Sequence, residues 1–331
     1  MRNIRFGVVS TANIAQTQLI PAIRRAKYAE LVGIASSSEK VKEIAAACSI
    51  PKVYGSYEAL LQDPDIDAVY IPLPNHLHKR WVLEAAKAGK HVLCEKPAAL
   101  TAEEASEMVT ACRDNQVIFM EAFMYQFHPQ HERVKEIISS GEVGDIRLIR
   151  SSHSFFLEDR ETNIRMNNTM GGGSLYDVGC YSVHSIRHIL QSEPVEVFVQ
   201  AEIDPTSGVD VSAYGLLSLE NGVKAMFDCS FDMVGRNEYE IVGTRGTIHV
   251  PYAYRPDLIN GNVGIVSITI GNKTREEKIQ GDAYALQVEH FSKAILNDEQ
   301  PSQTGANTIQ NMRVIDACYE SINTGKTISI Q

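Results

Sequence analysis

The chain opens on the segment that decides its fold, Ile4-Arg5-Phe6-Gly7-Val8-Val9 followed by Ser10-Thr11-Ala12-Asn13-Ile14-Ala15. The first six residues form a short, mostly apolar run typical of a buried strand. Behind the turn, Ile14, Leu19 and Ile23 recur at helical spacing. The sequence therefore predicts a strand, a tight turn and a helix at its beginning.

The same alternation continues toward residue 120. Further strands are predicted at residues 31–35, 68–71, 91–94 and 117–120, and helices at 39–48, 77–88 and 101–115. Gly89 is a natural helix C-cap, and Thr101 is a good N-cap. Strand–helix alternation is typical of a doubly wound parallel sheet. We therefore expect an α/β domain of the Rossmann type over residues 1–121.

The second half of the chain has a different period. Apolar and polar side chains alternate over residues 195–203, 223–227 and 266–270. A period of two predicts antiparallel strands with one buried face. Two helical patterns close the chain, one from Tyr284 to Ile295 and one from Met312 to Ile322. We expect residues 122–331 to form an α+β domain with a large, mostly antiparallel open sheet.

Composition and charge weigh against several classes of protein. The net charge of −10 weighs against binding to nucleic acid or to an anionic membrane surface. No apolar run approaches the roughly twenty residues that a membrane span needs. The chain enters a strand pattern at once, without the apolar region of a signal peptide. The six cysteines are scattered and lie mostly in apolar stretches, which predicts reduced thiols in a cytoplasmic protein.

The turn after the first strand is a candidate phosphate site that is poor in glycine. A dinucleotide fingerprint places glycines where backbone amides approach a pyrophosphate. Here the three fingerprint positions are Ser10, Ala12 and Ala15. The alternative is a plain strand–helix turn. If the turn does hold a dinucleotide, its contacts come from Ser10, Thr11, Ala12, Asn13 and Ile14.

The end of the second predicted strand favours NADP. NAD sites usually place a carboxylate there for the ribose 2′-hydroxyl. This strand ends instead in Ser36 and Ser37, with Lys40 nearby, and hydroxyls with a lysine suit a 2′-phosphate. Glu39 keeps NAD possible. The alternative role, N-capping of the next helix by Ser38, is compatible with both.

A lysine and a tyrosine are the candidate proton-handling groups. Lys96 follows the predicted strand 91–94 and stands at the carboxyl edge, where ligands bind in open α/β sheets. Gly171-Gly172-Gly173 precedes a helix that can present Asp177, Tyr181 and His184 on one face. A lysine beside a tyrosine can carry protons to and from an alcohol oxygen.

These segments together resemble the Gfo/Idh/MocA family of nicotinamide-dependent oxidoreductases, over nearly the whole chain. The resemblance rests on Glu95-Lys96-Pro97, on Pro74-Asn75-His76-Leu77-His78 and on the glycine-rich run from Gly171 to Tyr181. It implies that Pro74, Asn75 and His78 lie along the nicotinamide ribose and that Glu95 is a further cofactor-binding residue. It also implies that Lys96 contacts both that ribose and the substrate oxygen. Tyrosine at Tyr181 is similar to the branch containing glucose–fructose oxidoreductase, dimeric dihydrodiol dehydrogenase and NADP-dependent xylose-type dehydrogenases.

Three further residues are candidates for substrate binding. Tyr125 and His128 lie in Phe123-Met124-Tyr125-Gln126-Phe127-His128-Pro129, which resembles another family segment, although aromatic residues here equally suit interdomain packing. His184 stands where aspartate is common in the family. His184 and His188 also have metal spacing, but Ser185 follows the first histidine and no third ligand is obvious, so no metal is expected.

The sequence thus predicts an NAD(P)-dependent oxidoreductase, with NADP preferred, that acts on a sugar-like or polyol substrate. Tyr181 is the expected general acid/base, its pKa lowered by Lys96, and Asp177 orients the substrate or assists the relay. The resemblance implies a homodimer or homotetramer formed through the C-terminal sheet. Two alternatives stay open, a non-catalytic NADP-binding regulator and an NAD-dependent glycoside hydrolase on the same scaffold.

Overall fold

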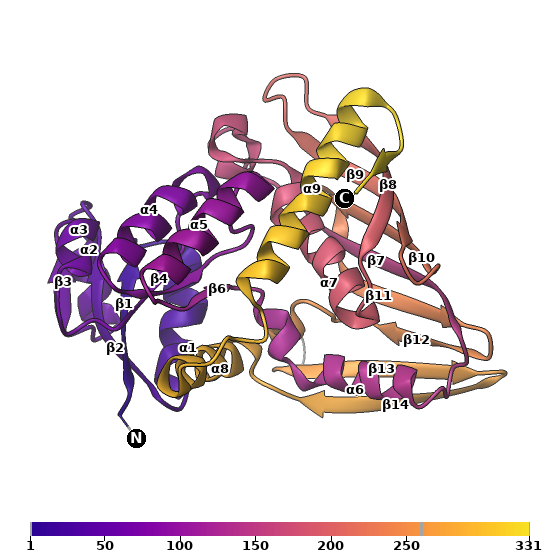
Figure 1. Cartoon of the computed structure of the whole chain (residues 1–331), viewed down its shortest axis with the longest axis horizontal. Helices are drawn as coiled ribbons and strands as arrows, with labels where there is room; N and C mark the ends of the chain where they lie inside the picture. The colour runs from indigo at the N-terminus through magenta and orange to yellow at the C-terminus, as the bar shows by residue number, and fades with distance from the viewer. Residues whose placement is uncertain (1, 259–260, 331) are drawn as a thin grey trace. The chain divides into compact units, whose positions relative to one another are not determined.

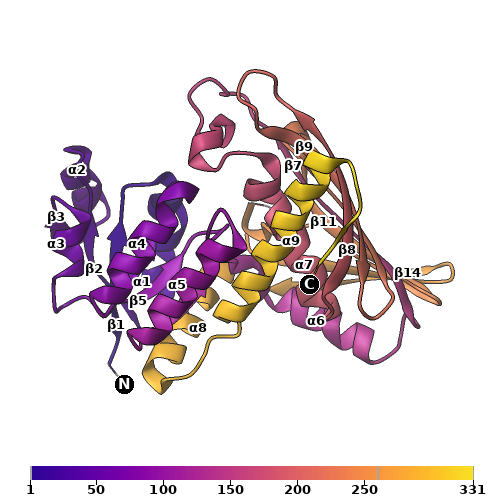
Figure 2. The ribbon, with the colours of Figure 1, turned by 45° about the horizontal axis from the view of Figure 1, so that its top comes forward.

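The computed structural model describes residues 2–258 and 261–330. The chain divides into two compact units (Figures 1 and 2). Unit 1 comprises Met1–Met124 and Tyr284–Gln310, and unit 2 comprises Tyr125–Ala283 and Asn311–Gln331. The return of the chain to unit 1 after residue 283 is a feature that the hydrophobic pattern did not indicate.

Unit 1 is built on a six-stranded sheet in the order β3-β2-β1-β4-β5-β6. All neighbouring strands in it run parallel, which confirms the predicted doubly wound sheet. The strands are β1 (Ile4–Val9), β2 (Ala29–Ala35), β3 (Lys52–Tyr54), β4 (Ala68–Ile71), β5 (His91–Cys94) and β6 (Phe119–Glu121). The helices are η1 (Ala15–Leu19), α1 (Ile20–Arg25), α2 (Lys40–Ala47), α3 (Tyr57–Leu61), α4 (Asn75–Lys87), α5 (Ala102–Asp114) and α8 (Ala283–Asn297).

Helix α8 joins unit 1 through its apolar face. The rings of Phe291 and Phe6 lie 6.1 Å apart, which packs the helix onto the first strand. The backbone amide of Lys27 also donates to Glu289 Oε1 at 3.0 Å. The helix was predicted from its period, but its partner β1 is far away in sequence, so only the structure assigns it to this unit.

Unit 2 is built on a nine-stranded sheet in the order β14-β13-β12-β11-β7-β10-β9-β8-β15. Its neighbours pair antiparallel except β10 and β7, which run parallel. The strands are β7 (Ile146–Phe156), β8 (Pro194–Ile203), β9 (Asp210–Leu219), β10 (Lys224–Ser230), β11 (Asp232–Gly243), β12 (Gly246–Val250), β13 (Val263–Ile270), β14 (Lys273–Gln280) and β15 (Ile328–Ser329). The helices are η2 (Met124–Phe127), α6 (Pro129–Ser139), η3 (Ile164–Met166), η4 (Asn168–Met170), η5 (Leu175–Gly179), α7 (Cys180–Leu190) and η6 (Pro256–Leu258), together with most of α9 (Gly305–Thr324), whose first residues belong to unit 1.

The two faces of the nine-stranded sheet differ in how far their side chains are exposed to solvent. On β9, Ala213 and Leu217 are fully buried while Tyr214 and Leu216 are 38% and 47% exposed. Met226 on β10 is likewise 45% exposed. The alternation predicted for residues 223–227 is confirmed on β10, where Ala225 and Phe227 are buried and Met226 between them is exposed, because successive side chains of a strand point to opposite faces. The described chain thus presents an open sheet face that carries several large apolar side chains.

Candidate functional site

The turn after β1 has the backbone of a glycine turn although it contains none. Ser10 has a φ of 111°, a conformation that glycine adopts easily and other residues avoid. Its hydroxyl accepts a bond from the amide of Ala12 at 3.0 Å and lies 3.5 Å from the carbonyl oxygen of Pro72. The side chain therefore holds the strained turn in place. This fit to the first fingerprint position favours a dinucleotide turn over a plain connection.

The rest of the turn is accessible. Thr11, Ala12, Asn13 and Ile14 are partly or fully exposed, just before the π-helical turn η1. Because η1 and α1 follow without a break, this turn leads into the start of a helix, where backbone amides favour an anion. The predicted contact residues therefore share one exposed turn.

The three residues predicted to contact the 2′-phosphate, near the end of β2, differ in their exposure to solvent. Ser37 and Lys40 are exposed, whereas Ser36 is 7% exposed and its hydroxyl accepts from the amide of Ser38 at 3.2 Å. Ser38 in turn accepts from the amide of Lys40 at 3.3 Å, but the N-cap of α2 is Glu39, which makes no side-chain cap bond, so Ser38 is not the N-cap that the alternative expected. The Lys40 ammonium makes no bond to the described residues. Ser37 and Lys40 can thus meet a phosphate directly, while Ser36 shapes the turn.

The loops after β4 and β5 lie at neighbouring strand ends, since Ile71 pairs with Cys94. Pro74 and Asn75 begin α4 and are half-buried, as are Glu95 and Lys96. The Lys96–Pro97 peptide bond is cis. The predicted ribose and catalytic segments of unit 1 therefore share one edge of the sheet.

His78 differs from its predicted role. The resemblance implied that it lies along the nicotinamide ribose, but its ring is fully buried. Its two ring nitrogens face the backbone carbonyls of Leu73 and Pro97. A direct contact with a cofactor therefore has no geometric support.

In unit 2, the glycine run is shaped by a buried carboxylate. Gly173 has a φ of 118°, and a Cβ there would lie 2.2 Å from Asp210 Oδ1. Asp210 is 2% exposed and accepts from the Ser174 hydroxyl at 2.8 Å and the Leu175 amide at 2.7 Å. Tyr319 donates to its other oxygen at 3.0 Å. Asp210 thereby fixes the start of η5, and through it the position of Asp177.

Asp177 forms an ion pair that sequence reasoning missed. Arg165 Nε donates to Asp177 Oδ2 at 2.6 Å, and the guanidinium lies 5.7 Å from the ring centre of Phe155. The carboxylate of Asp177 raises the pKa of Arg165, and Tyr181 adds to the effect. Gly172 leaves room for this loop, because a Cβ there would lie 2.5 Å from the Arg165 carbonyl oxygen. The local spacing of residues does not predict this ion pair, because it forms only when the loop that carries Arg165 folds back toward Asp177.

Tyr181 on α7 lies within a cluster of rings, which we call the aromatic cluster. It is 7% exposed. Its ring centre lies 5.1 Å from that of His153, 5.4 Å from that of Tyr254 and 5.9 Å from that of Tyr125. Tyr254 is itself fixed by hydrogen bonds with the hydroxyls of Ser151 and Ser185. These neighbours restrict the phenol to one orientation.

Tyr125 and His184, predicted separately for substrate binding, contact each other. The Tyr125 hydroxyl lies 2.6 Å from His184 Nδ1, and both residues are almost fully buried. Burial raises the pKa of Tyr125 well above its ordinary value, so the hydroxyl keeps its proton and donates. His184 Nδ1 is then the acceptor, which leaves the proton of a neutral ring on Nε2. Tyr125 thus links His184 to the aromatic cluster, since its ring also lies 5.9 Å from that of Tyr181.

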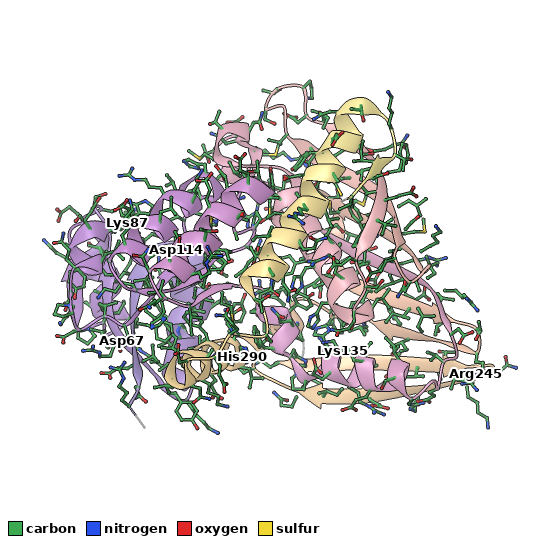
Figure 3. The ribbon with its side chains drawn as sticks, viewed as in Figure 1. Asp67, Lys87, Asp114, Lys135, Arg245 and His290 are labelled. Carbon is green, nitrogen blue, oxygen red and sulfur yellow. The ribbon has the colours of Figure 1, made fainter. Side chains whose placement is uncertain are left out.

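His128 and His188 have structural roles. His128 Nδ1 caps α6 by accepting from the Gln130 amide at 3.2 Å, and its Nε2 lies 3.2 Å from the carbonyl oxygen of Asn262. The substrate contact predicted for His128 therefore lacks geometric support. His188 Nε2 lies 2.9 Å from the Lys135 ammonium (Lys135 is labelled in Figure 3). Burial, followed by the charge of Lys135, lowers the pKa of His188 to about 3, so the ring accepts this bond.

The described residues also bear on two other kinds of site, a metal centre and a membrane span. Among them, no group of three or more histidine, cysteine, aspartate or glutamate residues is arranged to hold a metal ion. None of the helices in the same part of the chain has the length and apolar character needed to cross a bilayer.

Comparison with known proteins finds full-length relatives. The family model described as "Oxidoreductase family, NAD-binding Rossmann fold" matches residues 4–123, and the "GFO/IDH/MocA C-terminal domain" matches 131–249. D-xylose 1-dehydrogenase (NADP(+)) 2 from Haloferax volcanii is 38% identical over 326 residues, 98% of this chain and 99% of that protein.

Two solved structures are also similar. Aldose-aldose oxidoreductase from Caulobacter crescentus, complexed with glycerol, has a TM-score of 0.92 at 25% identity over 99% of this chain and 100% of that one. KijD10, a 3-ketoreductase from Actinomadura kijaniata in complex with NADP and TDP-benzene, has a TM-score of 0.90 at 29% identity over 97% and 98%. The strand orders of both sheets, the glycine-like turn at Ser10 and these matches agree: the chain belongs to the Gfo/Idh/MocA family of oxidoreductases.

Proposed function

We propose that this protein is an NADP-preferring oxidoreductase that interconverts an alcohol and a carbonyl group on an aldose-like sugar. The observation that carries the proposal is the Tyr181 phenol, held by the aromatic cluster, with the ion pair of Arg165 and Asp177 formed four residues before it in the chain. The similarity to a D-xylose dehydrogenase that uses NADP(+) supports the choice of substrate class and cofactor.

The residues of unit 1 fit a dinucleotide. The exposed turn from Ser10 to Ile14 would take the pyrophosphate, and Ser37 with Lys40 the 2′-phosphate. Asn75 and Lys96 would lie beside the nicotinamide ribose. When bound, NADP accepts or supplies the hydride at its nicotinamide C4.

The chain's own residues would manage the substrate oxygen. During alcohol oxidation, the phenolate form of Tyr181 would take the hydroxyl proton while the neighbouring carbon loses hydride, and in reduction the Tyr181 phenol would return that proton. The Lys96 ammonium would stabilise negative charge that develops on that oxygen. Asp177, fixed by Arg165, would accept a hydrogen bond from a second sugar hydroxyl and so orient the ring.

The direct test is turnover of sugars. The purified protein is mixed with D-xylose and a panel of other aldoses in the presence of NADP⁺, and NADPH formation is followed by absorbance. We expect oxidation of at least one aldose. NADPH binding without any turnover would instead point to a regulatory protein, and retained NAD with glycoside cleavage but no net reduction would point to the hydrolase alternative.

Cofactor preference provides a second prediction, which concerns Lys40. The protein should bind NADPH at least about tenfold more tightly than NADH, because a charged hydrogen bond to the 2′-phosphate contributes on that scale. Lys40→Ala should remove most of this preference while leaving NADH binding unchanged. Fluorescence titration measures both constants.

The matched control for this prediction is Lys42→Ala, two residues further along α2. Lys42 is exposed and lies 3.6 Å from Glu39, so the same charge is removed without touching the predicted phosphate site. Equal loss of NADPH affinity in both variants would mean that overall charge, not a bond from Lys40, sets the preference. Equal affinity of the wild type for the two cofactors would contradict the 2′-phosphate site.

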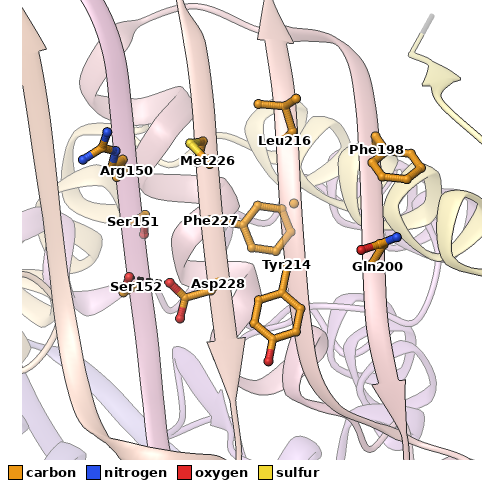
Figure 4. Close-up of a pocket in the computed structure, with 11 residues that line it drawn as sticks. Arg150, Ser151, Ser152, Phe198, Gln200, Tyr214, Leu216, Met226, Phe227 and Asp228 are labelled. Atoms are coloured by element: carbon orange, nitrogen blue, oxygen red, sulfur yellow. Dashed lines mark hydrogen bonds between the residues drawn. The ribbon is translucent and has the colours of Figure 1, made fainter.

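We also propose that the open face of the nine-stranded sheet pairs with a second copy of the chain. A hollow of about 370 Å³ lies on this face (Figure 4), bordered by Phe198, Tyr214, Leu216 and Met226 together with Arg150, Asp228 and Gln200. Apolar centres with charged and polar margins are typical of protein interfaces. The face therefore supports the homo-oligomer predicted from the resemblance.

Leu216→Arg should disrupt that assembly. A charge buried in an interface without a partner is strongly unfavourable, so the dissociation constant should rise at least about tenfold. Size-exclusion chromatography with light scattering measures the change. Leu258→Arg is the control, because Leu258 is 66% exposed in η6 and outside this face. An unchanged assembly in Leu216→Arg would assign the interface to another surface.

A further inference from the structure

The segment that carries Lys96 is held in unit 1 by side chains from three different elements. The hydroxyl of Tyr70, on β4, donates to Glu95 Oε1 at 2.6 Å. The amide of Ala98 donates to Glu121 Oε1, at the end of β6, at 2.9 Å. The third contact comes from His78 on α4. Glu95, Pro97 and Ala98 are thereby fixed, so the backbone on both sides of Lys96 is anchored.

His78 differs from the other two anchors because it contacts two loops at once. Its Nδ1 lies 2.9 Å from the carbonyl oxygen of Pro97, and its Nε2 lies 2.8 Å from the carbonyl oxygen of Leu73. Leu73 directly precedes Pro74 and Asn75, which begin the helix of the predicted ribose segment. One ring therefore spans the gap between the cofactor segment and the catalytic segment.

The environment keeps this ring neutral. His78 is fully buried, and burial lowers its pKa to about 4, although the two carbonyls act in the opposite direction. A neutral imidazole carries one proton, so at neutral pH it donates to one of the two carbonyls and contacts the other without a proton between them. The ring can thus set the spacing of the loops without taking part in proton exchange with the substrate.

We propose that His78 is a positioning residue that fixes the cofactor segment at Leu73–Asn75 and the catalytic segment at Glu95–Pro97 relative to each other. This inference rests on the proposed function, since it concerns where Lys96 stands with respect to the bound dinucleotide. Displacement of a reacting group by about 1 Å can cost about 100-fold in rate. A rigid spacer at this point is therefore a means of controlling turnover from outside the site.

Two conservative variants separate the two contacts. The amide of asparagine overlaps the Nδ1 position of histidine, so His78→Asn can keep the contact with Pro97 and loses the contact with Leu73. The longer glutamine reaches the Nε2 position, so His78→Gln can keep the contact with Leu73 and loses the contact with Pro97. We therefore expect opposite defects from two small amide side chains at one position.

Each variant is expected to change a different quantity, NADPH binding in one and turnover in the other. His78→Asn should weaken NADPH binding about tenfold with little change in kcat at saturating cofactor, because one buried contact has been lost at the cofactor segment. His78→Gln should keep the NADPH dissociation constant and lower kcat at least about tenfold. His91→Asn is the control: His91 is a partly buried histidine at the opposite end of β5 that accepts from the Ile118 amide, and neither quantity should change.

Hydrogen exchange of the wild-type protein provides an independent test that needs no variant. If one ring joins the two segments, the non-proline amides of residues 73–76 and 95–98 should open together and be protected together by NADPH. Independent exchange of the two segments would overturn the inference even if both variants failed to fold. The inference would also be overturned if both variants lost binding and turnover to the same extent and these losses followed a lowered Tm. A matching loss in His91→Asn would show that such defects come from stability alone.

Failure of the proposed function is distinguishable from failure of this inference. If the wild type oxidises no sugar, the proposed function fails, and His78 is judged by NADPH binding and exchange alone. If the wild type is active and both variants match it in kcat and in NADPH affinity, the proposed function stands and the positioning role is wrong.

Discussion

Lys96→Ala should lower kcat/KM for the sugar by about 10³-fold while changing NADPH affinity much less. The ammonium is proposed to act on charge that develops on the substrate oxygen, and removing one such donor commonly costs two to three orders of magnitude. The loss should therefore fall mainly on kcat. Steady-state kinetics at saturating NADP⁺, with a parallel fluorescence titration, measures the two effects separately.

Lys96→Arg tests whether charge alone is sufficient. A guanidinium keeps the charge but is planar and larger, so it should restore only part of the activity. Lys87→Ala is the matched control, because Lys87 is an exposed lysine of the same unit that pairs with Glu84 at 2.9 Å (Lys87 is labelled in Figure 3). Full turnover in Lys96→Ala on a sugar that the wild type oxidises would remove Lys96 from the mechanism.

The parallel sheet of unit 1 could be predicted closely because its central strands are buried on both faces. β1, β4 and β5 have the bounds expected from their continuous apolar runs. β3 was missed, since Lys52–Tyr54 is a three-residue edge strand with little apolar surface. In unit 2 the period of two identified β8, β10 and β13, but it carries no information about partners. The parallel pairing of β10 with β7 depends on contacts between segments far apart in sequence.

The candidate site was predictable where a residue's neighbours in the chain define it. Lys96 and Tyr181 are in segments with recognisable composition, and Ser10 has the glycine-like backbone that the predicted first fingerprint position needs. Arg165 and Asp210 were missed, because each acts through a partner that folding brings to it. His78 was assigned to the cofactor by resemblance, whereas burial and its two carbonyl neighbours give it a role within the protein.

Tyr181→Phe should reduce kcat by about 10²- to 10⁴-fold, the range for loss of a general acid/base. The substitution removes one hydroxyl and keeps the ring, so contacts with His153, Tyr254 and Tyr125 remain and the fold should not change. The KM for the sugar should change little. The kcat of the variant should also lose the pH dependence that the phenol confers on the wild type, because no group is left to exchange that proton.

The pH profile is the part of this experiment that distinguishes chemistry from packing. Tyr176→Phe is the control, since Tyr176 lies in η5, packs against Tyr319 at 4.8 Å between ring centres and has no proposed role in proton transfer. A loss of packing would lower Tm and leave the shape of the profile intact, in either variant. A loss of the acid/base would flatten the profile in Tyr181→Phe alone, at an unchanged Tm. If Tyr181→Phe keeps both the rate and the profile of the wild type, the proton must travel through another group, and the ring of Tyr181 serves only to fill the aromatic cluster.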